Sequence, residues 1–345
     1  SIIKYDKEYK NLKDQLLGFK NEISKKEKLF INNLDYLENN LTKKTNTGMN
    51  QKDLYIINND TLISDNFIVP SNKKLVIKEG VTIKLKNSLI EIFGEFLAIG
   101  NKNNQINIVG FSANESGTIL FNRSNGVTLD YLNFNNLTNS NTNFSQPASI
   151  IFYESKNINI NNTSFTNNQK GDDYINFFRS DNIKINNTLF QDIVNDAVDS
   201  DFSNNIIISN SKFIRIGNDA IDGSGSKIKV KNSFFKDVLD KGISAGEKSN
   251  IEIEDSVFQE NEIALVTKDE SNLVVKNNIL LNNKIDFASF RKKRFFDLPS
   301  ASFENTLISK YLIERNSKIQ GFEVSNFSIN IESQLYGNLY GRATE

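Results

Sequence analysis

The chain has 345 residues, of which 38% are hydrophobic, enough to fill a core. Its 41 Lys and Arg residues balance its 42 Asp and Glu residues, so no net field favours nucleic acid or an anionic membrane as a partner. Cys and His are absent, which excludes disulfides, thiolate chemistry, His metal sites and His-based triads and leaves Asp, Glu, Lys, Arg and Tyr for proton transfer. No run approaches the roughly 18 apolar residues of a membrane span, so none is predicted.

Residues 1–50 are predicted to form a helical segment that differs from the rest of the chain. Between residues 4 and 44 there is no Pro, and apolar side chains recur at spacings of three and four, at Tyr5, Tyr9, Leu12, Leu16, Phe19, Ile23, Phe30, Leu34, Leu37 and Leu41. This period is typical of an amphipathic helix or helix pair. The segment either packs on the main domain or forms a short coiled coil, so a homo-oligomer through residues 4–44 is one expectation.

Residues 51–345 are predicted to form a single all-β domain. Short runs rich in Ile, Val and Phe alternate with Asn, Asp, Ser and Gly, which indicates strands and turns. Similar segments begin at residues 157, 182, 205, 227, 250 and 272. This period leaves no room for a helix in every turn, which favours the stacked coils of a single-stranded parallel β-helix over a leucine-rich repeat. The regular repeat ends near residue 291, so an irregular C-terminal end is expected.

Alignment of the repeats places similar residues in columns. Two apolar columns are predicted to face inward, Ile158, Ile183, Ile206, Ile228, Ile251 and Leu273, and Ile160, Ile185, Ile208, Val230, Ile253 and Val275. A stacked aromatic column follows at Phe165, Phe190, Phe213, Phe235, Phe258 and Leu280. A polar column is predicted to form a ladder at a left-handed turn, at Asn162, Asn187, Asn210, Asn232, Asp255 and Asn277. A second strand in each coil is marked by Ile175, Val198, Ile221, Ile243 and Leu265.

Residues 54–290 resemble the parallel β-helix families, among them pectate lyase-like and polygalacturonase-like enzymes and phage tailspikes. The resemblance rests on the repeats and on the opening segment LVIKEGVTIKLKNSLIEIFGEFLAIG at 75–100. It implies a right-handed parallel β-helix. The turns SAGEKS at 244–249 and TKDES at 267–271 also resemble β-helix domains found alone or beside CotH-like proteins in bacterial surface-polysaccharide systems.

Acidic residues recur on the second strands. The segments that start at residues 171, 195, 218 and 240 align to give one outward column, Asp173, Asp196, Asp219 and Lys241, and another, Asn176, Asp199, Asp222 and Ser244. The small residues between them, Ala197, Ala220 and Gly242, are expected to let a flat ligand approach the carboxylates. Stacked carboxylates repel one another, so a proton or a Ca²⁺ ion held by Asp199 and Asp222 is expected between them. The alternative is that these acids are solvated turn residues without a function.

The first acidic column is similar to the catalytic positions of polygalacturonases. In that alignment Asp196 matches the first acid, Asn218 and Asp219 match the acid pair, and Lys241 with Gly242 matches the His-Gly position. The resemblance implies catalytic roles for Asp196, Asp219 and Lys241. However, Asn218 cannot ionise and Lys241 is not histidine, which departs from the two carboxyl groups of an inverting hydrolase. A lyase-like β-elimination, with Lys241 as the base and Ca²⁺ on the uronate, is the alternative that pectate lyase-like enzymes suggest.

The expected function is binding of an acidic polysaccharide, with or without its cleavage or modification, by an exported bacterial protein located outside the cell or in the periplasm. The residues expected to bind the glycan are Asp173, Asp199, Asp222, Glu247, Lys248 and Lys268. A basic patch at 291–294 either contacts an acidic glycan or marks the end of the regular coils. The competing hypothesis is a non-catalytic structural or adhesive rod, such as a surface or tailspike component.

Overall fold

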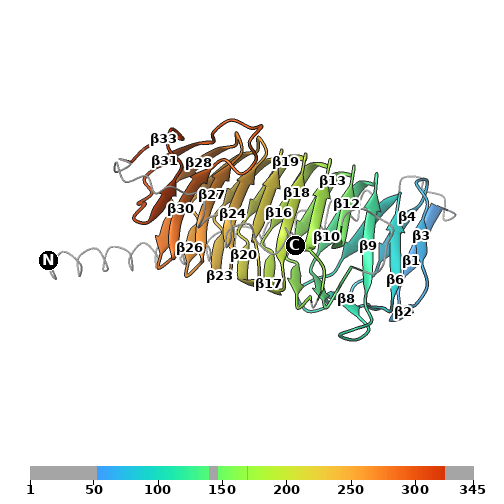
Figure 1. Cartoon of the computed structure of the whole chain (residues 1–345). Coiled ribbons are helices and arrows are strands. Elements are labelled where there is room, and N and C mark those ends of the chain that lie inside the picture. The colour runs from blue at the N-terminus through green and yellow to red at the C-terminus, as the bar shows by residue number, and fades with distance from the viewer. Residues whose placement is uncertain (1–52, 140–146, 169, 323–345) are drawn as a thin grey trace, which may run out of the picture. The chain divides into compact units, whose positions relative to one another are not determined.

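The computed structural model describes residues 53–139, 147–168 and 170–322, and it confirms a parallel β-helix (Figure 1). The helix predicted for residues 1–50, with the coiled coil of residues 4–44, lies outside the described residues. Each regular coil contributes one strand to each of three parallel sheets, and strands that are neighbours in space belong to successive coils. In the part of the chain that the structure describes, no helix is long and apolar enough to cross a membrane.

We call the three sheets A, B and C. Sheet A contains β1 (Leu54–Ile57), β4 (Lys74–Ile77), β7 (Glu95–Ile99), β10 (Asn125–Asp130), β13 (Lys156–Asn161), β16 (Asp181–Asn186), β19 (Asn204–Ser209), β22 (Lys227–Lys231), β25 (Asn250–Glu254), β28 (Asn272–Lys276), β31 (Ser300–Glu304) and β33 (Lys318–Gln320). Sheet B contains β2 (Thr61–Ile63), β5 (Thr82–Leu85), β8 (Ile106–Gly110), β11 (Leu132–Asn135), β14 (Ser164–Thr166), β17 (Leu189–Ile193), β20 (Lys212–Ile216), β23 (Phe234–Val238), β26 (Val257–Gln259) and β29 (Ile279–Leu281). Sheet C contains β3 (Phe67–Val69), β6 (Ser88–Ile92), β9 (Gly117–Asn122), β12 (Ala148–Tyr153), β15 (Asp173–Phe178), β18 (Asp196–Asp201), β21 (Ile221–Ser224), β24 (Lys241–Gly246), β27 (Ile263–Lys268), β30 (Ile285–Phe290) and β32 (Tyr311–Ile313).

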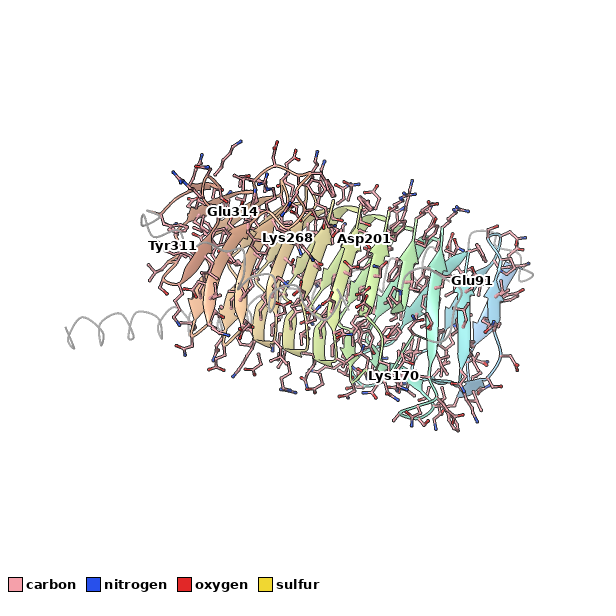
Figure 2. The ribbon with its side chains drawn as sticks, viewed as in Figure 1. Glu91, Lys170, Asp201, Lys268, Tyr311 and Glu314 are labelled. Carbon is pink, nitrogen blue, oxygen red and sulfur yellow. The ribbon has the colours of Figure 1, made fainter. Side chains whose placement is uncertain are left out.

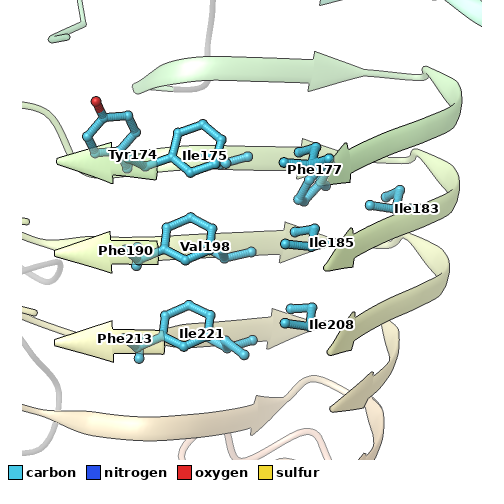
Figure 3. Close-up of a cluster of buried hydrophobic side chains, with 14 of the residues drawn as sticks. Tyr174, Ile175, Phe177, Ile183, Ile185, Phe190, Val198, Ile208, Phe213 and Ile221 are labelled. Carbon is cyan, nitrogen blue, oxygen red and sulfur yellow. The ribbon is translucent and has the colours of Figure 1, made fainter. Parts of the chain in front are cut away.

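The inward columns predicted from the sequence are confirmed by the strand register. Ile183 pairs with Ile158 on one side and with Ile206 on the other, and Phe213 pairs in the same way with Phe190 and Phe235. The Phe rings stack nearly parallel, with centroids 4.5 to 5.0 Å apart between successive coils. Figure 3 shows this repetition inside the helix, where Phe190 and Phe213 stack and Ile185 and Ile208 fill the same place in successive coils.

The predicted Asn turn lies between sheets A and B. Every residue of this column has a positive φ, between 47° and 54°, the left-handed conformation that Asn tolerates better than most residues. The amide of Asn187 donates to Asn162 Oδ1 at 2.6 Å, as a ladder requires, but the amide of Asn210 donates to Asn186 instead. The turn is therefore confirmed, and its side-chain ladder is continuous over part of its length.

A serine ladder, which the sequence analysis did not find, lies at the turn between sheets C and A. The backbone N–H of Ser180 donates to Ser203 Oγ at 2.8 Å, and the N–H of Ser203 donates to Ser226 Oγ at 3.0 Å. Each hydroxyl in turn donates to a backbone carbonyl, as Ser203 Oγ does to Phe177 at 3.0 Å. These buried hydrogen bonds hold successive turns in register along one edge of sheet C.

Beyond β30 the coils become irregular. Residues 291–299 contain no strand, and the chain returns to sheet A with β31, which pairs with β28. The strands β32 and β33 then extend sheets C and A by one member each. The basic residues 291–294 therefore lie in the irregular segment that connects β30 of sheet C to β31 of sheet A.

Candidate functional site

The predicted acidic columns come together on the outer side of sheet C. We call the group the Asp–Lys cluster, and two of its members are labelled in Figure 2. It is carried by β15, β18, β21, β24 and β27 and by the turns that precede β21 and β24, and it consists of Asp173, Asp196, Asp199, Asp201, Asp219, Asp222, Asp240, Lys241 and Lys268. The core residue Ile221 and its outward neighbour Asp222 alternate on β21, which is why the acids face away from the Ile and Phe columns.

The three predicted catalytic residues form a hydrogen-bonded chain across successive coils. Asp196 Oδ1 accepts a hydrogen bond from the backbone N–H of Asp219 at 2.7 Å. Asp219 Oδ1 accepts hydrogen bonds from both the backbone N–H and the Nζ of Lys241, each at 3.1 Å. The side chains of Lys241 and Asp219 are 4% and 3% exposed, so this is a buried arrangement rather than a solvated surface.

Lys241 also contacts Asp240, which precedes it in the chain and lies outside the two predicted columns. Lys241 Nζ donates to Asp240 Oδ2 at 2.5 Å. Burial alone would lower the pKa of Lys241, but the charges of Asp219 and Asp240 outweigh burial and raise it. Lys241 therefore keeps its proton at neutral pH. Because a protonated amine cannot accept a proton, this geometry does not support the role of general base.

Asp240 is an acid of the cluster whose pKa lies near neutral pH. Burial raises its pKa to about 7, the neighbouring charge of Asp219 adds to this, and Lys241 offsets part of it. Its Oδ1 atom is buried and has no hydrogen-bond partner. The group can therefore hold or release a proton at physiological pH, as a general acid or base must.

The pKa values of the Asp173, Asp196 and Asp199 carboxyls are raised well above their usual value. Burial is the main cause in each case, and the charges of neighbouring aspartates add to it. All of these shifts oppose ionisation in the folded protein. The predicted repulsion between stacked aspartates is thus present in the structure, and protons relieve it in the absence of a cation.

Asn176 lies among three of the acids. Its Nδ2 donates to Asp199 at 2.8 Å and to Asp201 at 3.3 Å, and Asp173 Oδ2 lies 3.5 Å away. Asn176 is 1% exposed, and its Oδ1 atom has no hydrogen-bond partner. A buried amide oxygen without a donor costs free energy, about 1–3 kcal/mol for such a group, and is available to a ligand.

Lys268 reaches Asp222 by lying across a glycine. Its Nζ is 3.8 Å from Asp222 Oδ1, and a Cβ added at Gly246 would lie 2.7 Å from Lys268 Cε. Burial alone would raise the pKa of Asp222, but Lys268 and then Lys241 outweigh it, so the pKa is held below its usual value. Asp222 is therefore ionised at neutral pH, and 23% of its side chain is exposed.

Lys292, from the basic patch, faces the same cluster and was not assigned to it from the sequence. Burial lowers its pKa to about 8, and the positive charge of Lys268 adds to the effect. Asp222 acts in the opposite direction. Lys292 therefore loses its proton more easily than Lys241 does. The sequence did not reveal this residue, because an alignment of repeats cannot show that residues 291–294 fold back towards sheet C.

Glu247 and Lys248, both predicted to bind the glycan, lie in one loop but have different partners. The loops around residues 247 and 269 are stacked, because the backbone N–H of Lys248 donates to the Asp269 carbonyl at 2.9 Å. Glu247 accepts a hydrogen bond from Ser224 Oγ and pairs with Lys293, both at 2.5 Å. The side chain of Lys248 is 59% exposed and pairs with Glu270 at 3.2 Å, not with an acid of the cluster.

The expected role of the small residues is wrong. Ala197 and Ala220 are fully buried members of the hydrophobic core. A Cβ on Gly242 would lie 2.6 Å from the Ala264 carbonyl oxygen and 2.9 Å from the ring of Phe258. Because Ala197 and Ala220 are buried in the core and Gly242 packs against Phe258, these residues do not provide an approach for a ligand.

The hypothesis that the acids are solvated turn residues also fails for most of the cluster, because Asp173, Asp196, Asp219 and Asp240 are each at most 6% exposed. Within residues 53–139, 147–168 and 170–322, no group of three or more acidic side chains is arranged to hold a metal ion. A Ca²⁺ ion at Asp199 and Asp222 therefore stays a prediction.

Comparison with known proteins agrees with the fold. The family described as "Right handed beta helix region" matches residues 173–339. A surface adhesin of Streptococcus pneumoniae, PfbA, superposes with a TM-score of 0.52 at 13% identity, over 79% of this chain and 84% of the adhesin. An alginate lyase from Paenibacillus sp. str. FPU-7 gives a TM-score of 0.43 at 14% identity, over 75% and 98% of the two chains. No curated protein matches the sequence.

The sheet topology shows a parallel β-helix, and the family match identifies residues 173–339 as a right-handed β-helix region. The adhesin, at 13% identity, supports the fold alone, and any function must be argued from the residues of this chain.

Proposed function

We propose that the protein binds a polysaccharide along the outer side of sheet C, at the Asp–Lys cluster. The observation that carries the proposal is the concentration of seven aspartates and two lysines on successive coils, next to a buried amide oxygen without a partner. In the coils on either side, the same column of sheet C is apolar, because Ile151 on β12 pairs with Asn176 and Val266 on β27 pairs with Ser244. The polar residues are therefore not a general requirement of this sheet.

The cluster opposes folding, which supports a function. Burial raises the pKa of most of its carboxyls, so each of them costs stability when it ionises. Asn or Ser at the same positions would satisfy the turns without that cost. Residues that reduce stability without a packing role are characteristic of binding and catalytic sites.

The proposed glycan is acidic, and the negative charges of the cluster limit where such a glycan can bind. Aspartates outnumber lysines, so a uronate can approach only where the acids keep their protons or where a cation neutralises them. Lys268 and the partly exposed Asp222 mark the place where such a charge balance already exists. We extend the proposal to a Ca²⁺ ion held by Asp199 and Asp222, whose carboxylate oxygens are the ligand type that Ca²⁺ prefers.

For cleavage or modification of the glycan, the cluster supplies Asp240 as the group that transfers a proton. Its pKa of about 7 suits that role, and Lys241 fixes its position through the 2.5 Å hydrogen bond. Asp196 and Asp219 then act as positioning residues for Lys241. The proposal includes export of a bacterial protein to the periplasm or the cell surface, which is supported by the surface adhesin of the same fold.

Adhesion without chemistry is the second candidate function. The pneumococcal adhesin has the same fold, and fold alone does not separate an adhesin from an enzyme. The two functions differ in one observable, because an enzyme shortens or alters the polymer that it binds and an adhesin leaves it unchanged.

The test is binding to a glycan array, followed by calorimetric titration of the bound glycans with and without a chelator. Product analysis after long incubation then separates an enzyme from an adhesin. Binding of an acidic glycan that weakens with chelator supports the full proposal. Failure to bind any polysaccharide would refute it.

A further inference from the structure

An aromatic edge borders the Asp–Lys cluster where sheet C turns into sheet A. Tyr153 and Phe178 end β12 and β15, are paired in register, and have rings stacked 5.5 Å apart at 3°. Phe202 follows β18, and its ring meets that of Phe178 edge-on at 6.3 Å. We call these three residues the aromatic edge.

Phe202 is the exposed member of this edge. It is 55% exposed and has a φ of 52°, a conformation that is uncommon for a bulky side chain. The same turn in preceding coils holds Arg123, Glu154 and Arg179, all with positive φ, so the conformation belongs to the turn and only the exposed phenyl ring is unusual.

The next coil makes room for this ring. A Cβ added at Gly225 would lie 2.7 Å from Phe202 Cδ1 and 3.0 Å from Cε1, so the ring rests against the glycine backbone. Gly225 has a φ of 63°, in the same turn. The ring is therefore held in place while more than half of Phe202 faces solvent.

Charged groups surround the aromatic edge. The guanidinium of Arg179 lies 5.1 Å from the Phe178 ring centroid, and that of Arg123 lies 5.8 Å from the Tyr153 centroid. Glu154 pairs with Arg123 at 2.8 Å and reaches Arg179 at 3.9 Å. Asp201, a member of the Asp–Lys cluster, directly precedes Phe202 and accepts a hydrogen bond from Asn176 Nδ2 at 3.3 Å.

We propose that Phe202 is a sugar-binding platform, on which a pyranose ring of the glycan stacks while Asp201 and Arg179 contact its hydroxyl or carboxylate groups. This inference rests on the proposed function and adds a subsite to it. A pyranose has an apolar C–H face and a polar rim, which matches one exposed ring bordered by charges. A protein partner or a lipid surface would need a larger contiguous apolar area.

The decisive variant is Phe202→Asn, because Asn is well tolerated at left-handed turn positions and already occupies them between sheets A and B. We expect a melting temperature equal to or above that of the wild type, together with a loss of glycan affinity of about tenfold or more. Phe202→Tyr should restore binding, since it keeps the stacking face. Leu307→Asn, which removes an apolar side chain that is 82% exposed between β31 and β32, is the matched control and should bind as the wild type does.

The probes are polygalacturonate, alginate and a neutral β-glucan, each titrated into the wild-type protein and the three variants by calorimetry. Wild-type affinity in Phe202→Asn would overturn this inference and leave the proposed function intact. An equal loss in Leu307→Asn would overturn it as well, because the effect would not be specific to the ring. Absence of binding by the wild type to all three probes would instead refute the proposed function, and the subsite with it.

Discussion

Replacement of Asp240 by Asn should make the protein more stable at alkaline pH and leave it unchanged at acid pH. Burial raises the pKa of Asp240 from 3.8 to about 7. A group with a raised pKa in the folded state contributes its full stability below the unfolded pKa, and that stability is lost as the pH rises to the folded pKa. About three units correspond to roughly 4 kcal/mol of unfolding free energy lost between pH 4 and pH 7.

The assay is urea denaturation of the wild type and of Asp240→Asn at pH 4 and at pH 8. Other acids of the cluster titrate in both proteins, so the change in unfolding free energy between pH 4 and pH 8 is measured for each protein. These two changes should differ by about 4 kcal/mol. Asp255→Asn is the control, because it removes an exposed carboxylate at a position where neighbouring coils already hold Asn. Parallel pH profiles for wild type and Asp240→Asn, or a less stable variant at pH 8, would refute the reasoning.

Two further predictions concern the core and the cluster. Phe213→Ala should cost about 3–5 kcal/mol of unfolding free energy, because removal of a fully buried ring stacked between two others leaves a cavity. A variant that unfolds at the same urea concentration as the wild type would contradict this. Asp199→Asn should raise the melting temperature at pH 7, since burial opposes the charge of Asp199, whereas Asp222→Asn should lower it, since Lys268 stabilises the charge of Asp222. Shifts of the same sign in both variants would show that the two acids do not differ as the structure indicates.

The repeat made much of the fold predictable. Residues that stack in adjacent coils must be similar in size and polarity, so the Ile and Phe columns could be aligned and their inward direction assigned from the period of two. The left-handed turn followed from Asn at every repeat. The serine ladder was missed because Ser is frequent in turns of many kinds, and its repetition at Ser180, Ser203 and Ser226 carries no signal without knowledge of burial.

The site was predictable only in part. Alignment of the second strands correctly brought Asp196, Asp219 and Lys241 together, because register follows from the repeat. The roles of these residues could not be derived, since they depend on burial and on which charges meet in space. Burial moves the pKa of Asp240 to about 7 and that of Lys292 to about 8, and both residues lie at positions that the aligned acidic columns do not contain.

The central claim is that the Asp–Lys cluster binds a polysaccharide, and titration of one cluster variant with a matched control tests it most directly. Polygalacturonate and alginate are titrated into the wild type, Asp222→Asn and Asp255→Asn, after urea denaturation has shown that all three are folded at the temperature used. The account predicts that the wild type and Asp255→Asn bind at least one of these polymers with equal affinity, and that Asp222→Asn binds it about tenfold more weakly or worse, because the ionised, partly exposed acid beside Lys268 is lost. Equal binding by all three proteins, or binding by none, would contradict it.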